Sequence, residues 1–360
     1  MTGRESSPTA VEVRDLVVRY DDTLAVDRVS LSAPAESVLA LVGPSGCGKT
    51  SLLRTIAGFE TPLTGEVLID GKAVAGNGSW VAPEDRQVGM VFQQGALFPH
   101  MTVRKNVLYG VAKSPDARRR AEESLDLVGL ARLADRYPDQ LSGGQQQLVA
   151  LARALAPSPK LVLLDEPFAN LDAGLRARLR QEVRTILERA RMTAILVTHD
   201  QDEALSLAAT VAVMGRGCIL QTGPPEEIYH RPATVEVAEF IGGGQLLRCS
   251  VVNGRLESAL GPLTTDAPDG TAQLLVRPEE VLVSWNGARG GVAGKLARRS
   301  FFGHDLLNEI RLSTGETVTV RTLNYVDRAL GSRMRLMLRA GPYRVYRDNG
   351  TTHVAETVKE

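Results

Sequence analysis

Eight residues starting at Gly43 have the types and spacing of a loop that binds phosphate. They follow the apolar run 38–42 and precede a helical pattern at 51–57, which is the context that such a loop requires. Its glycines let successive N–H groups face one anion, and the helix start adds a positive dipole end. Lys49 would contact the β and γ phosphates, and the Thr50 hydroxyl would hold Mg²⁺. The predicted nucleotide-binding residues are Gly43, Pro44, Ser45, Gly46, Cys47, Gly48, Lys49, Thr50 and Ser51.

A second candidate site lies where an apolar strand pattern ends in two adjacent carboxylates, Asp165 and Glu166. Successive side chains of a strand point to opposite sides, so the two can take different tasks. Asp165 would reach Mg²⁺, and Glu166 would polarise the attacking water. His199, at another strand end, would contact the γ-phosphate or hold that water, unless it is only structural. Gln93 would join the Mg²⁺ shell or orient water, unless it is only a polar cap. The predicted catalytic residues are thus Glu166, His199, Lys49 and Gln93, and the predicted metal ligands are Thr50, Gln93 and Asp165.

A third segment, 141–145, reads Leu-Ser-Gly-Gly-Gln and leads into a helix rich in alanine and leucine. Ser142 is a good N-cap, and the glycines leave the first N–H groups exposed, so this helix start is a second anion site. Because the segment lies on a helical insertion, it would not meet the phosphate loop of its own chain. In a head-to-tail pair of subunits it would close over the γ-phosphate held by the other chain. The simpler alternative is a capped helix.

These segments need a scaffold that brings strand ends together. Up to about residue 240, short apolar runs alternate with helical patterns, which predicts an α/β domain on a largely parallel sheet. Strands are expected at 38–43, 87–93, 160–165 and 193–198, with a helical subdomain inserted at about 96–158. After three glycines at 242–244, short strands and turn pairs such as Asn253-Gly254 and Asn286-Gly287 predict a small all-β, OB-like domain. The expected domains are 1–241 and 245–360.

Composition excludes several classes of protein. The 360 residues contain 42 Lys+Arg and 42 Asp+Glu, and a net charge of zero argues against general nucleic-acid binding. No apolar run approaches the roughly 20 residues that cross a bilayer, and the polar start lacks a secretory signal. Three scattered cysteines suggest no disulfide framework, so a reducing cytoplasm fits best.

Taken together, the motifs resemble the nucleotide-binding subunit of ATP-binding cassette (ABC) transporters. The phosphate loop, Gln93, the segment 141–145, the run 161–167, the triplet Asn170-Leu171-Asp172 and His199 occur in the family's order. The resemblance implies a P-loop NTPase cassette that hydrolyses ATP with Mg²⁺, with Glu166 as the general base. It also implies that Tyr20 stacks on adenine, unless Tyr20 is a packed strand residue, that Gln93 senses the membrane partner, and that Asp172 lies across a dimer interface. The predicted nucleotide contacts of the third segment are Ser142, Gly143, Gly144 and Gln145, with Ser142 and Gly144 acting in trans. Leu148 departs from the family, which commonly has Arg there.

From residue 223 onward the chain resembles importers whose ATPase carries a C-terminal regulatory β-domain, which senses a ligand or stabilises the dimer. The runs 80–86, 96–100 and 168–172 look most like ferric-iron importer subunits, although spermidine/putrescine, sulfate, sugar and phosphonate importer subunits share most of them. The resemblance implies a homodimer at the cytoplasmic face of the membrane, bound to transmembrane permease subunits and served indirectly by an extracytoplasmic solute-binding protein, with no nucleic-acid partner.

Two other classes stay open. A soluble ABC ATPase of DNA repair or translation would normally carry long insertions or two cassettes in one chain. A nucleotide-dependent switch without turnover would be expected to lack Glu166 or His199.

Overall fold

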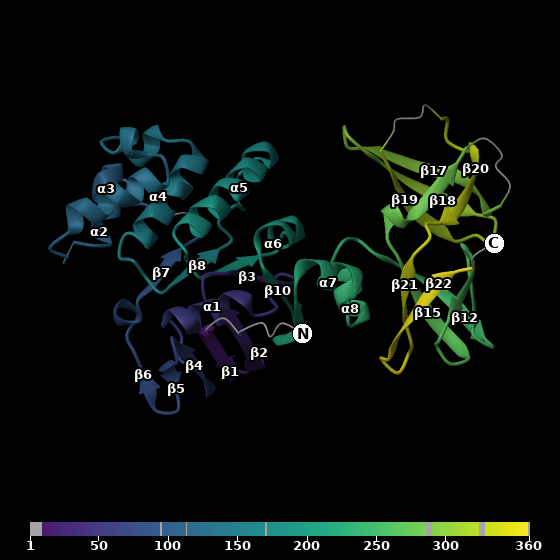
Figure 1. Ribbon diagram of the computed structural model, residues 1–360, viewed down its shortest axis with the longest axis horizontal. Helices are drawn as coiled ribbons and strands as arrows, with labels where there is room; N and C mark the ends of the chain where they lie inside the picture. Colours follow the sequence, from purple (N-terminus) through teal and green to yellow (C-terminus); the bar gives the residue numbers. More distant parts are fainter. Residues whose placement is uncertain are drawn as a thin grey trace, which may run out of the picture. The chain divides into compact units, whose positions relative to one another are not determined.

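The computed structural model describes residues 9–93, 96–112, 114–169, 171–285, 290–323 and 328–358. The chain forms two compact units, Met1–Glu226 and Glu227–Glu360 (Figure 1). The boundary expected at 241–245 lies further along the chain than this division. Asn170 and the predicted turn at 286–287 lie outside the described residues.

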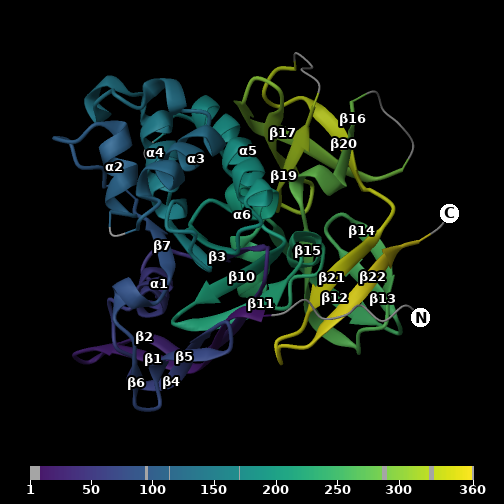
Figure 2. The ribbon, with the colours of Figure 1, turned by 60° about the vertical axis from the view of Figure 1, so that its left-hand side comes forward.

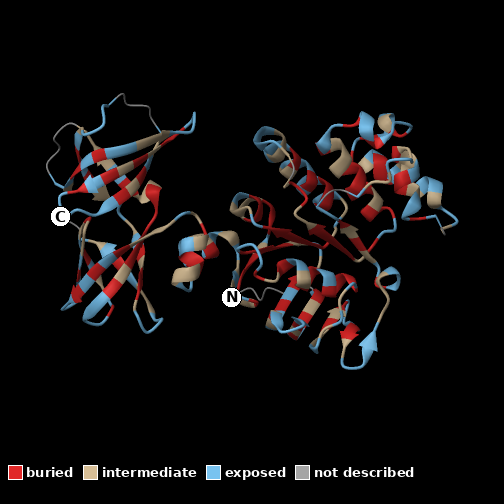
Figure 3. Ribbon diagram, turned by 180° about the vertical axis from the view of Figure 1, so that it is seen from behind, coloured by how far each residue is buried: buried red, intermediate tan, exposed pale blue. Residues whose placement is uncertain are grey.

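The first unit is built on a six-stranded sheet with the order β11-β10-β3-β9-β8-β7. Five of its strands run parallel, and β11 pairs antiparallel with β10. The apolar runs of β3, β8, β9 and β10 are almost entirely buried (Figure 3), as expected for strands that are covered on both faces. The predicted α/β fold with its parallel strands is confirmed. The bounds are β3 Val38–Val42, β7 Val88–Val91, β8 Leu161–Asp165, β9 Ala194–Thr198, β10 Thr210–Gly215 and β11 Cys218–Gly223.

A second, antiparallel sheet of the first unit was not predicted from the sequence. Its order is β2-β1-β4-β5-β6, and its apolar residues share one core with helix α1 (Lys49–Ala57) and the parallel sheet. Leu52, Leu53 and Ile56 of α1 belong to this core, so α1 is fixed by apolar packing from both sheets. The bounds are β1 Thr9–Tyr20, β2 Thr23–Pro34, β4 Thr64–Ile69, β5 Lys72–Gly76 and β6 Ser79–Trp80.

The helical insertion is present between β7 and β8. It contains α2 (Val103–Tyr109), α3 (Ala117–Leu127) and α4 (Gly143–Leu155), which gather on the side of the unit away from the antiparallel sheet (Figure 2). Helices α5 (Ala173–Arg189) and α6 (Gln201–Leu207) follow β8 and β9. None of the helices within the described ranges is long and apolar enough to span a membrane.

The second unit is all-β apart from its first two helices, as predicted. Strands β12-β13-β14-β22-β21-β15 close a barrel, and a five-stranded sheet has the order β16-β20-β17-β18-β19. One apolar core, which includes Leu274, Leu296 and Leu336, runs through both parts. The barrel bounds are β12 Gln245–Val252, β13 Arg255–Ser258, β14 Gly261–Thr265, β15 Gly270–Val276, β21 Pro342–Tyr346 and β22 Thr352–Thr357. The sheet bounds are β16 Val281–Ser284, β17 Val292–Phe301, β18 Leu306–Leu312, β19 Thr317–Thr322 and β20 Arg333–Leu338.

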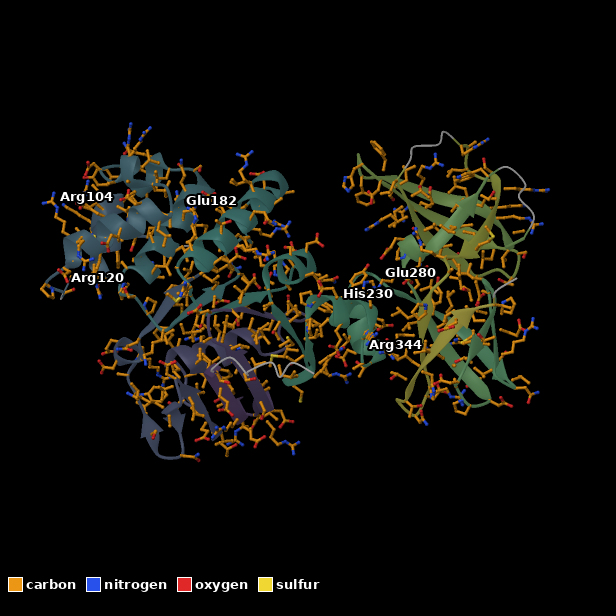
Figure 4. The ribbon with its side chains drawn as sticks, viewed as in Figure 1. Arg104, Arg120, Glu182, His230, Glu280 and Arg344 are labelled. Atoms are coloured by element: carbon orange, nitrogen blue, oxygen red, sulfur yellow. The ribbon has the colours of Figure 1, made fainter. Side chains whose placement is uncertain are left out.

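A buried arginine holds helices α7 (Pro225–His230) and α8 (Val235–Phe240) to the β-strands. Arg277 is 2% exposed and donates hydrogen bonds of 2.5 Å to the carbonyls of Ile241 and Tyr229. Its guanidinium also lies 3.9 Å from the centre of the Tyr229 ring. Burial raises the pKa of Glu280 in the 3₁₀ turn η4 (Pro278–Glu280), while Arg277 and, to a smaller extent, His230 of α7 act in the opposite direction. Figure 4 labels His230 and Glu280. The end of α7 and the segment after α8 therefore belong with the second unit.

Candidate functional site

The loop between β3 and α1 has the backbone that its glycines predict. Gly48 caps α1 with φ +105°, and a Cβ there would lie 2.1 Å from the Ala25 carbonyl oxygen. A Cβ at Gly43 would lie 2.1 Å from the Met214 carbonyl oxygen. Gly46 has φ +80° but open space around it. Close approach of neighbouring backbone therefore requires glycine at 43 and 48, whereas only the φ angle favours glycine at 46.

Gly48→Ala is expected to destabilise the protein by about 2 kcal/mol or more and to weaken nucleotide binding, because strain and a backbone clash add together. Gly46→Ala is the matched control, with strain of about 1 kcal/mol and no clash. Urea unfolding and titration with a fluorescent nucleotide measure both effects. Equal losses in the two variants would contradict the close approach at Gly48.

Lys49 is buried inside this loop, at 6% exposure. Its Nζ donates to the carbonyls of Gly43 at 2.7 Å and Pro44 at 2.9 Å, and the Cys47 Sγ lies 3.7 Å away. Within the described ranges no carboxylate lies close enough to form an ion pair with it. A thiol is a weak hydrogen-bond acceptor. The N–H of Lys49 that faces Cys47 Sγ can therefore most easily donate to a phosphate oxygen instead. A buried cation without a carboxylate partner favours binding of an anion.

The ends of β7, β8 and β9 bring together three of the predicted residues. Gln93 Nε2 donates to Glu166 Oε2 at 3.1 Å, and His199 Nδ1 lies 3.1 Å from Glu166 Oε1. The Glu166 N–H donates to the Val197 carbonyl at 2.9 Å, and its φ is +44°. The Glu166 carboxylate is thereby contacted at one oxygen from each neighbouring strand.

Asp165, the last residue of β8, is half-buried. Burial raises the pKa of its carboxyl group, and the Glu166 carboxylate raises that pKa further, while Arg54 and Lys49 act in the opposite direction. A divalent cation at this position would favour the ionised form of Asp165.

The segment 141–145 begins α4 and lies away from the phosphate loop, since α4 and α1 are separated in both Figure 1 and Figure 2. Ser142 Oγ accepts from the Gln145 N–H at 3.4 Å, and Gln145 Oε1 accepts from the Ser142 N–H at 3.0 Å. A Cβ at Gly143 or Gly144 would lie 3.1 Å from a leucine methyl group of the segment that leads into α5 or of α5 itself. Within one chain the segment is a capped helix start.

Three further residues have definite places. Tyr20 ends β1 and is 39% exposed, which leaves part of its ring open to a ligand. Asp172 caps α5, because its Oδ1 accepts from the Leu175 N–H at 2.9 Å. Leu148 is buried in α4, at 4% exposure, so packing takes the place of the polar contact that the family's arginine suggested.

Comparison with known proteins decides the family. Residues 26–169 match the ABC transporter family model, and residues 274–345 match that of the TOBE domain. The chain is 46% identical over 333 residues to the Fe(3+) ions import ATP-binding protein FbpC 2 of Rhodococcus jostii (strain RHA1), covering 90% of this chain and 95% of that relative. It is 42% identical over 334 residues to FbpC of Yersinia pestis, with the same coverage. The chain belongs to the ABC transporter ATPases. As an ABC ATPase, it binds and hydrolyses ATP.

Solved structures of other ABC cassettes match the first part of the chain. The cbiO1 structure from Clostridium perfringens, part of the ABC transporter complex cbiONQ, has a TM-score of 0.58 at 28% identity and covers 62% of this chain and 91% of its own. A nucleotide-free ATP-binding cassette from an ABC transporter has a TM-score of 0.57 at 26% identity and covers 64% of this chain and 98% of its own.

Arg86 is a positioning residue of the ABC ATPase that the sequence did not single out. It is 2% exposed, and its Nη1 donates to the carbonyls of Thr55 at 2.8 Å and Ile56 at 2.9 Å, near the end of α1. Its guanidinium lies 4.7 Å from the centre of the Trp80 ring. Arg86 thus stabilises the helix that follows the predicted phosphate loop. Its only sequence signal was its place in the run 80–86.

Asp165→Asn is expected to raise the thermal midpoint of the nucleotide-free ABC ATPase at neutral pH by about 1–3 °C. Because the folded-state pKa of Asp165 is raised, the folded state holds more protons than the unfolded state, so stability falls as pH rises through that window. The cost of the charge is absent well below about pH 4, where both states are protonated, and it grows as pH rises above that value. Thermal unfolding at pH 7 and well below pH 4 measures the change. Asp126→Asn, at an exposed residue of α3, is the control. A stabilisation that is equal at both pH values would contradict this account.

Proposed function

We propose that this ABC ATPase powers import of a small solute, ferric iron, through a separate membrane permease. The observation that carries the proposal is that similarity to Fe(3+) ions import ATP-binding proteins extends over 90% of the chain and includes both the cassette and the TOBE domain. Relatives that match the cassette alone would not distinguish between substrates.

Nucleotide binding rests on the phosphate loop. Its N–H groups and the start of α1 face the phosphates, and Lys49 adds a buried positive charge beside them. Tyr20 offers an exposed ring for the adenine. These contacts position the terminal phosphate for in-line attack by water.

The side chains of Thr50, Asp165 and Gln93 have the chemistry to hold a magnesium ion. Mg²⁺ prefers oxygen ligands, which are present as the exposed Thr50 hydroxyl, the Asp165 carboxylate and the Gln93 amide oxygen. The pKa of Asp165 is raised because the nearby positive charges do not fully offset the burial of its carboxylate. When bound, Mg²⁺ neutralises phosphate charge during transfer. Thr50, Asp165 and Gln93 would hold it.

Glu166 acts as the general base in this proposal. Gln93 and His199 orient its carboxylate by contacts at separate oxygens, and each oxygen keeps a lone pair for a water molecule. Glu166 takes the proton as that water attacks the γ-phosphorus, and ADP leaves as the bond from the γ-phosphorus to the bridging oxygen breaks. His199 stabilises the γ-phosphate itself.

The active form is a homodimer. Because the segment 141–145 lies away from its own phosphate loop, Ser142, Gly143, Gly144 and Gln145 would complete the site of the second chain, with Asp172 across the interface. ATP bridges the two chains until hydrolysis separates them. This motion is passed through the region of Gln93 to permease subunits at the cytoplasmic face of the membrane, while a solute-binding protein supplies the iron from outside.

Uptake measurements in a strain that lacks this chain test the proposal. Uptake of labelled ferric iron is expected to fall to background and to return with the wild-type chain, whereas uptake of labelled polyamine stays unchanged. Loss of polyamine uptake with intact iron uptake would contradict iron as the substrate. A stable complex with ribosomes or nucleic acid in place of a membrane protein would contradict the transport function.

A further inference from the structure

The second unit contains a cavity of about 350 Å³ that the ATPase mechanism does not use. It lies where η4 and β16 meet the ends of β17, β18 and β19, and Arg339 after β20 completes it. Its size is at the lower end of the range of small-molecule sites, about 300–1,000 Å³.

Its charged lining is mainly positive. Arg299, Arg321 and Arg339 line it together with a single carboxylate, Glu279. Glu279 accepts a hydrogen bond from the Tyr229 hydroxyl of α7, so one of its carboxylate oxygens already has a partner. Three guanidinium groups around a concave surface attract an anion.

Two of these arginines have few partners of their own. Arg299 Nε donates to Asn308 Oδ1 at 3.2 Å, and Asn308, which is 1% exposed, donates to Thr322 Oγ1 at 3.1 Å. Arg299 Nη2 is buried without a hydrogen-bond partner in the part of the chain that the structure describes. No ion pair is found for Arg299 or Arg339 in the same part. By contrast, Arg321 Nε lies 3.1 Å from Asp305 Oδ2. Arg299 is therefore held in place by a neutral amide and keeps its full charge for a ligand.

Apart from Thr322, the rest of the wall is apolar. Its large side chains are Trp285, Leu306 and Leu323, and Val281 and Val283 of β16 add to it. A bare inorganic anion would leave these surfaces without contact, whereas a carboxylate with an apolar body would use both parts of the lining.

We propose that this cavity binds a small organic monocarboxylate, with its carboxylate at Arg299 and Arg339 and its apolar body against Trp285 and Leu306. The site lies wholly within the second unit and is independent of the nucleotide site. It assigns to the C-terminal domain a ligand of definite chemistry.

Trp285 provides a direct readout. The sequence has two tryptophans, so Trp80→Phe leaves Trp285 as the only indole in the full-length chain. Benzoate and hexanoate are titrated against its fluorescence with Mg-ADP saturating the nucleotide site. Benzamide is the neutral analogue of benzoate, and inorganic phosphate is the anion without an apolar body.

We expect a saturable response to benzoate or hexanoate, and a dissociation constant raised about tenfold or more by Arg339→Gln and by Arg299→Gln. Arg333→Gln, on the exposed face of β20, should leave it unchanged. Arg339 has the more exposed side chain, so its variant tests the site even if Arg299→Gln fails to fold. Absence of a response to both acids, an equal response to benzamide or phosphate, or equal affinity in the Arg339 and Arg333 variants would overturn the proposal. None of these results depends on ATP hydrolysis or iron transport.

Discussion

Glu166→Gln is expected to reduce ATP hydrolysis by about 10²–10⁴-fold while ATP binding stays intact. The amide retains the shape of the side chain and occupies the position between Gln93 and His199, but it cannot accept the proton of the attacking water. Steady-state phosphate release and nucleotide titration measure the two quantities. Glu182→Gln, on the exposed face of α5 (Figure 4), removes a carboxylate elsewhere and should leave both unchanged.

The same variant is expected to accumulate as an ATP-bound dimer. In the proposed dimer, hydrolysis removes the γ-phosphate that bridges the two chains, so a chain that binds ATP without turnover would stay closed. Light scattering after size-exclusion chromatography with Mg-ATP should give twice the monomer mass. A monomer under these conditions, in a variant that still binds ATP, would contradict the shared site.

Lys49→Met is expected to weaken ATP binding by about 10–100-fold, since a charge-assisted hydrogen bond to phosphate contributes about 1.5–3 kcal/mol. Methionine keeps an unbranched stem in the buried position and removes the charge. Titration calorimetry measures the affinity, and Lys72→Met on β5 is the control at an exposed lysine. Unchanged ATP affinity in a folded Lys49 variant would remove Lys49 from the phosphate site.

The central parallel sheet was predictable because its signals are local. Each strand is a short apolar run that leads into a residue with a predicted role in the site. All four predicted strands are present. The antiparallel sheet was missed because the pairing of β1 with β2 has register shifts that interrupt alternation, and because β4, the second partner of β1, follows only after β3 and α1. The helical insertion was predictable from its Ala- and Leu-rich composition.

In the site, too, some features could be predicted from the sequence and others could not. The sequence predicted a phosphate loop between β3 and α1, but it did not show that Lys49 donates to the carbonyls of Gly43 and Pro44. Nor did it show that Asp172 caps α5, or that Arg86 holds the end of α1. The Lys49 and Asp172 contacts are local but depend on the exact backbone course of a loop and of a helix start. The Arg86 contact joins positions 31 residues apart, so it becomes visible only when the elements pack. The hydrogen bonds from the buried Arg277 to Ile241 and Tyr229 likewise join positions 36 and 48 residues apart.

Transport in membrane vesicles tests the central claim most directly. The vesicles are prepared from cells that produce this chain with its membrane partners, and labelled ferric iron is supplied with the solute-binding protein. We expect iron to accumulate only when Mg-ATP is present on the side of this chain, and not to accumulate with Glu166→Gln. Iron accumulation without ATP, equal accumulation with the variant, or ATP-driven transport of polyamine but not iron would contradict the account.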